Sequence, residues 1–317
     1  MSESLLAKRN ASKPVLQEKK LHRIKRDWML YLMLILPLAQ YILFRYLPMG
    51  GIVIAFQKFN LFKGLFDQKW VGLDNFRFVF SLKDFGLALR NTLFLNMLDL
   101  IAGFPVPIIL AIMLSEMRSV KLKRVSQTLL YLPHFLSWVI IGGMVLEIFA
   151  PTNGIINKTI ISMGGQNIPF LSDGPHWVAT YVLVGVWQNM GWGTILYLAA
   201  ITNINTELYE AAEIDGANKL QRIWHVTLPG IRSTIVILLI LNVGQMMNIG
   251  FDRPFIIGNT LVQQYCDVIS TFVYRVAMKG AKYDRGAAIG LFQSAIGFIM
   301  ITTANYITRR IGEESIW

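Results

Sequence analysis

Long apolar runs alternate with shorter polar segments along the chain, and this alternation predicts its architecture. A run of about 20 apolar residues is long enough to cross a bilayer as a helix. Six such runs cover residues 28–47, 87–114, 128–149, 177–200, 231–249 and 286–307. The period-two alternation of a membrane barrel is absent from the sequence. The pattern therefore predicts an all-α integral membrane protein with six transmembrane helices.

Composition and charge agree with this architecture. Of the 317 residues, 54% are hydrophobic and 15% are charged, which leaves too little polar surface for a soluble globule of this length. The net charge of +11 lies at the edges of the apolar runs and not on one aromatic-rich soluble face, which argues against nucleic acid as a partner. Basic residues crowd the segment before the first run: Lys8, Arg9, Lys13, Lys19, Lys20, Arg23, Lys25 and Arg26.

The positive-inside rule places this basic segment in the cytoplasm. An even number of spans then places the carboxyl end, with Arg309 and Arg310, on the same side. The sequence thus predicts a basic cytoplasmic tail over 1–27, a transmembrane domain over 28–308 and a second cytoplasmic tail over 309–317. The first run lacks a small-residue cleavage pattern, so we expect it to be a retained anchor and not a signal peptide.

The chain lacks the motifs of a membrane enzyme or pump. It has no phosphate-binding Gly-Lys-Ser/Thr loop, its four histidines are scattered without a His-Glu-x-x-His pair, and Cys266 is its single cysteine. We therefore expect no catalytic site, no metal site and no cofactor held by this chain. Asp99 and Glu147 are the carboxylates inside apolar runs, where they suit a proton relay, a polar cavity or a partner contact.

The polar segment 205–229 lies between the fourth and fifth runs, on the predicted cytoplasmic side. Glu207, Glu210 and Glu213 recur every three residues and so line one side of a short helix. The neighbouring Ala211 and Ala212 allow another surface to approach that helix closely.

The second half of the 205–229 segment predicts a turn and another helix. Asp215-Gly216 supplies the break, with Gly216 in a left-handed conformation and Asp215 as the cap of the next helix. Pro229 marks the return to the membrane. The predicted apolar face of the second helix consists of Leu220, Ile223, Trp224 and Val226. Such a helical pair suits a docking site for a cytoplasmic partner, although a solvated amphipathic connector has the same pattern.

The residues of this segment resemble the EAA coupling loop of bacterial binding-protein-dependent ABC importer permeases. The resemblance rests on the motif residues and their spacing: Glu210, Ala211, Ala212, Asp215, Gly216, Ala217, Leu228 and Pro229, with Val226 where the family usually has Ile. It implies the type I importer permease fold and a location in the bacterial inner membrane. It also implies that these residues couple the chain to two cytoplasmic ATPase subunits, which bind the ATP.

Weaker resemblance extends over most of the chain. The segments 70–76, 91–92, 129–133 and 153–157 look like the maltose-permease-like branch of the carbohydrate uptake group, within which the chain resembles permeases for polysaccharide breakdown products. This implies an oligosaccharide cargo, a second homologous permease as partner and an extracytoplasmic substrate-binding protein.

A sugar path needs hydrogen-bonding and aromatic side chains inside the helix bundle. The fourth and fifth runs supply candidates: Gln188, Asn189, Gly191, Trp192, Thr194, Tyr197, Asn242, Gln245 and Asn248. The same amides and small residues also serve helix–helix packing. Near the predicted outer face, four basic residues suit either an acidic oligosaccharide or a docked binding protein: Arg253, Arg275, Lys279 and Lys282.

Three other functions fit parts of the pattern. An importer of a non-sugar solute shares the coupling motif, because that motif reports the ATPase and not the cargo. An ion-coupled secondary transporter needs paired intramembrane carboxylates across an internal repeat, which the sequence does not contain. A membrane scaffold needs no polar path, which Asn189, Gln245 and Asn248 argue against.

Overall fold

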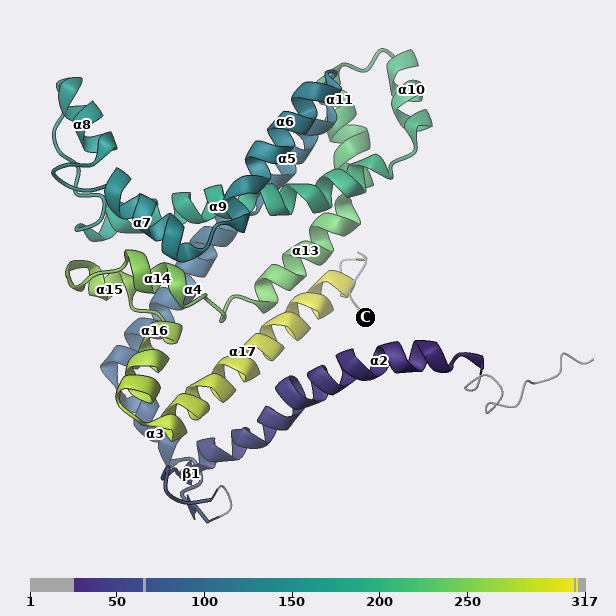
Figure 1. Ribbon diagram of the computed structural model, residues 1–317. Coiled ribbons are helices and arrows are strands. Elements are labelled where there is room, and N and C mark those ends of the chain that lie inside the picture. Colours follow the sequence, from purple (N-terminus) through teal and green to yellow (C-terminus); the bar gives the residue numbers. More distant parts are fainter. Residues whose placement is uncertain (1–25, 65–66, 311, 313–317) are drawn as a thin grey trace, which may run out of the picture. The chain divides into compact units, whose positions relative to one another are not determined.

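The computed structural model describes residues 26–64, 67–310 and 312, which are mostly helical (Figure 1). The chain forms two compact units, Met1–Val53 and Ile54–Trp317. The predicted basic tail, apart from Arg26 and Asp27, lies outside the described residues.

The first unit consists of the beginning of one long apolar helical run. This run starts with α2 (Trp28–Tyr41), continues through one π-helical turn at Ile42–Tyr46 and ends in the 3-10 helix Leu47–Phe56, whose last residues belong to the second unit. The run Trp28–Phe56 is 29 residues long and apolar enough to cross a membrane. It contains the predicted first span, 28–47.

The second unit opens with a small folded surface piece. Strands β1 (Gln57–Lys58) and β2 (Lys69–Trp70) pair antiparallel, with Gln57 opposite Trp70. Helix α3 (Asp74–Ser81) follows and is fixed by Asn75, whose amide donates to the carbonyls of Ala55 and Gln57 at 3.0 and 2.9 Å. The segment that follows the first long apolar helical run is therefore folded.

Two helices joined end to end cover the predicted second span. They are α4 (Lys83–Gly103) and α5 (Pro105–Ser115), and together they form a continuous apolar run of 33 residues. The boundary falls at Phe104 because the prolines that follow it have no backbone N–H to continue the hydrogen-bond ladder.

The predicted third span, 128–149, is not one straight helix. Helix α6 (Val120–Tyr131) runs into a 3-10 turn, Leu132–Phe135, and α7 (Trp138–Ile148) then leaves at an angle of 99°. Pro133 interrupts the helical hydrogen bonds. The Ser137 hydroxyl then caps α7 by accepting from the Ile140 N–H at 3.4 Å. The hydropathy of this stretch predicted an apolar segment long enough to span a membrane but not its bend.

Helix α9 (Gly174–Thr202) organises the second unit. It follows the short α8 (Ile155–Ser162), begins at an Asp173 cap and packs along α4, α5 and the turn Leu132–Phe135. Its 29 residues include no Asp, Glu, Lys or Arg. It is nevertheless not among the helices apolar enough to count as a candidate span, because the polar pair Gln188-Asn189 lowers its hydropathy.

The predicted fifth span also contains a bend. The 205–229 segment forms α10 (Thr206–Ile214), α11 (Lys219–Arg222), a π-helical turn at Ile223–Thr227 and the start of α12 (Leu228–Gly230). Helix α13 (Arg232–Gly244) continues at 61° to the helix before it. It ends five residues before the predicted boundary at Ile249, because the chain turns at Gln245–Asn248.

The carboxyl-terminal part consists of short helices and one long one. The short elements are α14 (Asp252–Ile257), the 3-10 turn Thr260–Val262, α15 (Gln263–Cys266), α16 (Ile269–Val273) and the π-helical turn Tyr274–Lys279. The long helix α17 (Tyr283–Arg310) contains the predicted sixth span and runs beside α13 (Figure 1). Within the described residues, three helices meet the length and composition of a span, or up to five if each bent pair is one span.

Three apolar clusters hold the second unit together. The amino-terminal half of α9 packs Trp177 and Tyr181 against α4, α7 and α14, and its carboxyl-terminal half packs Tyr197 and Ile201 against α5. A third cluster joins α3 and α4 to α16 and α17. Because both ends of α9 are packed in this way, the polar middle of the helix is held in place relative to the neighbouring helices.

Candidate functional site

The first half of the 205–229 segment is an exposed acidic helix. The Asn205 side chain caps α10 by accepting from the Glu207 N–H at 3.0 Å. The carboxylates of Glu207, Glu210 and Glu213 all belong to exposed residues of this helix. Ala211 is exposed beside them and Ala212 is half-buried, so a partner has access to one side of the helix backbone.

The turn after α10 follows the sequence prediction in one respect and not in another. Gly216 has φ of +78°, as predicted, and the Ala217 N–H closes the helix end by donating to the Ala212 carbonyl at 2.9 Å. Asp215 does not cap the next helix. That helix begins with a reciprocal capping box between Asn218 and Gln221, because Asn218 is the residue directly before its first turn.

Two side-chain contacts join the arms of the segment. The Arg222 Nη1 atom lies 3.4 Å from Glu213 Oε2, and the Tyr209 hydroxyl lies 3.0 Å from the Thr227 Oγ1 atom. Both contacts bridge the turn at Gly216. The segment is therefore a braced helical hairpin and not a loose connector.

The predicted apolar face of the second arm divides in two. Leu220 and Trp224 are exposed, whereas Ile223 and Val226 are half-buried. Ile214 adds an exposed apolar side chain at the end of α10, with 86% of its surface accessible. Of the last two motif residues, Leu228 is half-buried and Pro229 is exposed. Exposed apolar side chains beside acidic ones form a surface suited to a protein partner.

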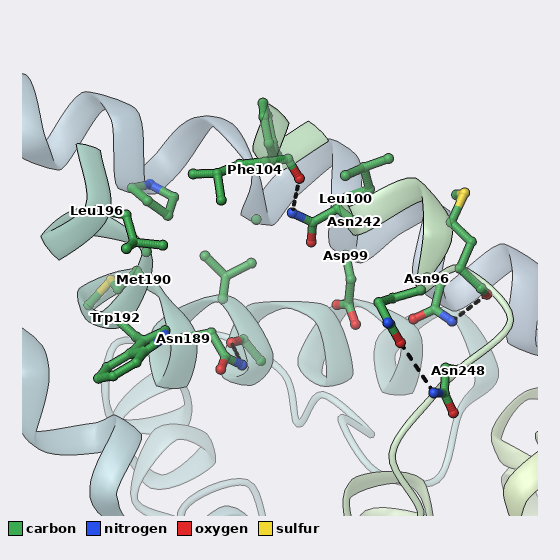
Figure 2. Close-up of a pocket in the computed structure, with 18 of the residues that line it drawn as sticks. Asn96, Asp99, Leu100, Phe104, Asn189, Met190, Trp192, Leu196, Asn242 and Asn248 are labelled. Atoms are coloured by element: carbon green, nitrogen blue, oxygen red, sulfur yellow. Dashed lines mark hydrogen bonds between the residues drawn. The ribbon is translucent and has the colours of Figure 1, made fainter. Parts of the chain in front are cut away.

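A polar cavity of about 420 Å³ lies between α4, α9, α13 and the turn that follows α13. Its polar lining consists of Asn96, Asp99, Asn189, Trp192, Tyr197, Asn242, Gln245, Asn248 and Arg253. Figure 2 labels six of them: Asn96, Asp99, Asn189, Trp192, Asn242 and Asn248. Six residues of the polar lining are among those that the sequence predicted for a substrate path. The volume falls within the range of cavities that hold small molecules.

The three remaining path candidates do not line the cavity. Gln188 is buried and donates to the Leu136 carbonyl at 3.4 Å, and Thr194 is buried and donates to the Met190 carbonyl at 2.6 Å. Gly191 lies against the backbone of Leu130, where a Cβ atom would overlap it. These residues serve helix packing, which was the alternative reading of the pattern.

Aromatic side chains border the polar groups of the cavity. The Trp192 indole stacks on the His134 imidazole, with ring centroids 4.8 Å apart and planes inclined by 10°. Phe104 and Tyr197 pack edge to face at 6.4 Å on the same cavity wall. Aromatic faces next to amides provide both apolar and hydrogen-bonding contact.

Asp99 and Arg253 form an ion pair in the cavity wall that the sequence did not predict. The guanidinium makes two hydrogen bonds to the carboxylate, with N–O distances of 2.7 and 3.1 Å. It also donates to the Tyr181 carbonyl and lies 3.5 Å from the centre of the Tyr181 ring. Arg253 is therefore buried among α4, α9 and α14 and is not a free cation of the outer face.

The other basic candidates lie away from the cavity. Arg275 pairs with Asp267 at 2.8 Å and with Asp84 at 3.6 Å, and the Lys279 ammonium lies 5.5 Å from the centre of the Tyr274 ring. Lys282 is exposed, Glu147 is exposed at the end of α7, and neither lines the cavity. Of the four predicted basic residues, Arg253 and Arg275 therefore form ion pairs within the chain.

Known proteins resemble this chain over most of its length. A family model for the binding-protein-dependent transport system inner membrane component matches residues 93–313. The protein LplB of Bacillus subtilis (strain 168) is 43% identical over 294 residues, which cover 93% of this chain and 92% of LplB. The polygalacturonan/rhamnogalacturonan transport system permease protein YteP of the same organism is 41% identical over 288 residues, covering 91% and 90% of the two chains.

Solved structures resemble it as well. A chain in the crystal structure of a bacterial ABC transporter involved in the import of the acidic polysaccharide alginate is 37% identical, with a TM-score of 0.84 over 92% of this chain and 99% of that chain. A chain in the complex of the alginate ABC transporter with its alginate pentasaccharide-bound periplasmic protein is 36% identical, with the same TM-score over 93% and 99%. From the family match and these relatives together, the chain belongs to the family of binding-protein-dependent transport system inner membrane components, the permease subunits of ABC transporters.

Proposed function

We propose that this permease carries oligosaccharides inward through the polar cavity. The observation that carries the proposal is the combination of amide side chains from α4, α9 and α13 with the rings of Phe104, Trp192 and Tyr197. Amides pair with hydroxyl groups, and aromatic rings pack against the apolar faces of sugars. The relatives support this cargo, since YteP is described as a polygalacturonan/rhamnogalacturonan permease and the structural relatives import alginate.

The proposed topology has six spans with both termini in the cytoplasm. Three spans are the long apolar helices, two are the bent pairs, and α9 is the remaining one. Gln188 and Thr194 in its polar middle are buried, which makes a less apolar helix acceptable in a membrane. Basic residues support the orientation, because Arg118, Lys121, Lys123 and Arg124 fall on the same side as Arg309 and Arg310. The tails then cover 1–27 and 309–317, with the transmembrane domain over 28–308.

The 205–229 segment is proposed to dock into a groove of an ATPase subunit. The exposed carboxylate of Glu210, the accessible Ala211 and Ala212, and the turn at Asp215, Gly216 and Ala217 form the contact, while Leu228 and Pro229 join it to α13. ATP is bound by the ATPase subunits and not by this chain. Their closure on ATP moves the hairpin as one body because its two arms are braced.

The proposed assembly contains four kinds of subunit. This chain pairs with a second homologous permease, which supplies the facing wall of the path. Two cytoplasmic ATPase subunits drive the pair, and an extracytoplasmic binding protein delivers the sugar. The related alginate transporter is described in complex with its sugar-bound periplasmic protein, which supports the last partner.

Reconstituted complexes test the proposal directly. We expect proteoliposomes containing the native chain, its partner permease and the ATPases to take up oligosaccharide and to hydrolyse ATP faster when sugar-loaded binding protein is added. Glu210→Lys places a cation on the docking helix, so stimulated hydrolysis should fall by roughly tenfold. Asp74→Lys is the matched control, because Asp74 is an exposed carboxylate at the start of a helix outside this segment, and it should behave as native.

Each part of the proposal can fail separately. Native rates of uptake and hydrolysis in Glu210→Lys complexes would refute the coupling role of the segment. Stimulated hydrolysis without sugar uptake by the native complex would refute the cargo and leave the coupling role standing.

A further inference from the structure

The amides that line the polar cavity are held in fixed orientations. The Nδ2 atom of Asn96 donates to the Met246 carbonyl at 2.7 Å, and that of Asn242 donates to the Leu238 carbonyl at 2.7 Å (Figure 2). The Asn189 amide donates to the Gly185 carbonyl at 3.0 Å and to Gln188 Oε1 at 3.4 Å. A backbone carbonyl only accepts, so in each case the nitrogen must face the protein. The three amide oxygens are then left to accept.

No described residue donates a hydrogen bond to the oxygens of these three asparagines. Asn96 is half-buried, Asn189 and Asn242 are exposed, and all three line the same cavity. They come from three helices, α4, α9 and α13, so their oxygens surround the space and do not form a single row. A ligand in the cavity therefore meets fixed acceptors from several directions.

The ion pair in the wall adds a fourth acceptor. Asp99 follows Asn96 by three residues on α4 and so lies on the same helix face. Its side chain is 25% exposed, whereas that of Arg253 is 10% exposed. The cation is enclosed by the carboxylate, the Tyr181 carbonyl and the Tyr181 ring. The carboxylate is thus the more accessible member of the pair.

Apart from Arg253, the donors in the lining are uncharged groups. The Gln245 oxygen accepts from Asn248 at 3.2 Å, which leaves the Gln245 amide nitrogen as a neutral donor. Among the described residues that line the cavity, Arg253 is the single cation, and Asp99 neutralises it. A hydroxyl group can both donate and accept, but a carboxylate can only accept. The lining therefore matches hydroxyl groups and lacks a counter-charge for a carboxylate.

We propose that Asp99 is a specificity-determining residue, which with Asn96, Asn189 and Asn242 selects the hydroxyl-bearing faces of a sugar and disfavours carboxylates on this wall. The inference rests on the proposed oligosaccharide cargo and adds which chemical groups this subunit contacts. The carboxylates of an acidic cargo must then face the second permease or water. Asp99 acts through its charge, and Arg253 is a positioning residue that holds that charge in the wall.

A paired-substrate uptake assay tests this proposal. The substrates are a short galacturonic acid oligomer and its carboxyl-reduced galactose form, each supplied bound to saturating binding protein. Asp99→Asn leaves Arg253 without a counter-charge, so the ratio of acidic to neutral uptake should rise by roughly tenfold. Asp99→Glu keeps the charge and should keep the native ratio. Asn242→Asp adds a carboxylate without touching the ion pair, so the ratio should fall.

The uptake ratio should rise in Asp99→Asn and fall in Asn242→Asp. A general loss of folding would instead lower the uptake rates of both sugars alike and leave their ratio unchanged. An unchanged ratio in both Asp99→Asn and Asn242→Asp, with uptake retained, would overturn the proposal. Should the native complex take up neither sugar while still responding to binding protein, the proposed cargo itself would be wrong, and this inference with it.

Discussion

The Tyr209 hydroxyl lies 3.0 Å from Thr227 Oγ1, so one hydrogen bond joins α10 to the π-helical turn that leads toward the membrane. Thr227 is buried, with 2% of its surface accessible. The bond links the exposed acidic helix to the start of α12 and α13 without passing through the turn at Gly216. A force on α10 is thereby transmitted across the hairpin as well as along the chain.

Removing this bond should loosen α10 without preventing docking. Tyr209→Phe and Thr227→Val each remove one partner, at a cost of about 1 kcal/mol. We expect faster amide hydrogen exchange in α10 and less transport per ATP hydrolysed, while ATPase subunits still co-purify. Because both changes break the same bond, the double variant should be little worse than either single one. Thr227→Ser is the control, and additive effects in the double variant would contradict the assignment.

The close approach of Arg253 to α9 makes Gly185 sensitive to substitution. A Cβ atom at Gly185 would overlap the Arg253 guanidinium, so Gly185→Ala should destabilise the fold by about 2 kcal/mol and lower the melting temperature in detergent. Gly86→Ala is the matched control in α4, where a Cβ atom meets nothing within 4 Å. That change should leave the melting temperature unchanged or raise it. Equal effects at both positions would refute the packing argument.

The buried ion pair should respond asymmetrically to single and double substitution. Asp99→Leu leaves an enclosed guanidinium unpaired, and Arg253→Met leaves a carboxylate unpaired, each at a cost of about 3–5 kcal/mol. The double variant removes both charges and should recover much of the lost thermal stability. Thermal unfolding of the purified complex measures all three. A double variant less stable than either single one would mean that the two residues do not act as a pair.

Cys266 should be nearly inert to thiol reagents in the folded protein. It lies outside the candidate spans, and burial raises the pKa of its thiol, so less thiolate is present at neutral or mildly alkaline pH than on a free cysteine. Maleimide labelling should be slow at pH 7 and rise with pH above the usual thiol range. Denaturation in detergent should make it fast. Rapid labelling of the folded chain at pH 7 would show that the α15 region opens.

The 205–229 segment was predictable because its structure depends on neighbouring residues. The Gly216 turn and the spacing of the carboxylates are local features, and both were predicted in place. The cap of α11 was predicted at Asp215, but the structure has it three residues later, at Asn218. Both residue types cap helices well, and only the geometry of the turn decides between them.

The cavity was predictable only in part. Amides inside an apolar run are conspicuous in sequence, which identified Asn189 and Asn242. Which of them face a cavity depends on the rotation of each helix, so the sequence could not show that Gln188 and Thr194 are buried against neighbouring backbone. The Asp99–Arg253 pair joins residues 154 positions apart, and no local pattern connects them. Hydropathy likewise reports how apolar a stretch is and not its direction, which is why the 99° bend before Trp138 was missed.

The polar middle of α9 has a consequence for how the protein is made. In the proposed six-span topology, the helix that supplies Asn189 and Trp192 to the cavity is the one that lipid alone stabilises least. It becomes stable in the bilayer once two segments synthesised earlier are in place, α5 against Thr194 and the chain around Leu136 against Gln188. The order of synthesis therefore favours insertion of α9 into the membrane, because the segments that cover its polar side chains are synthesised before it.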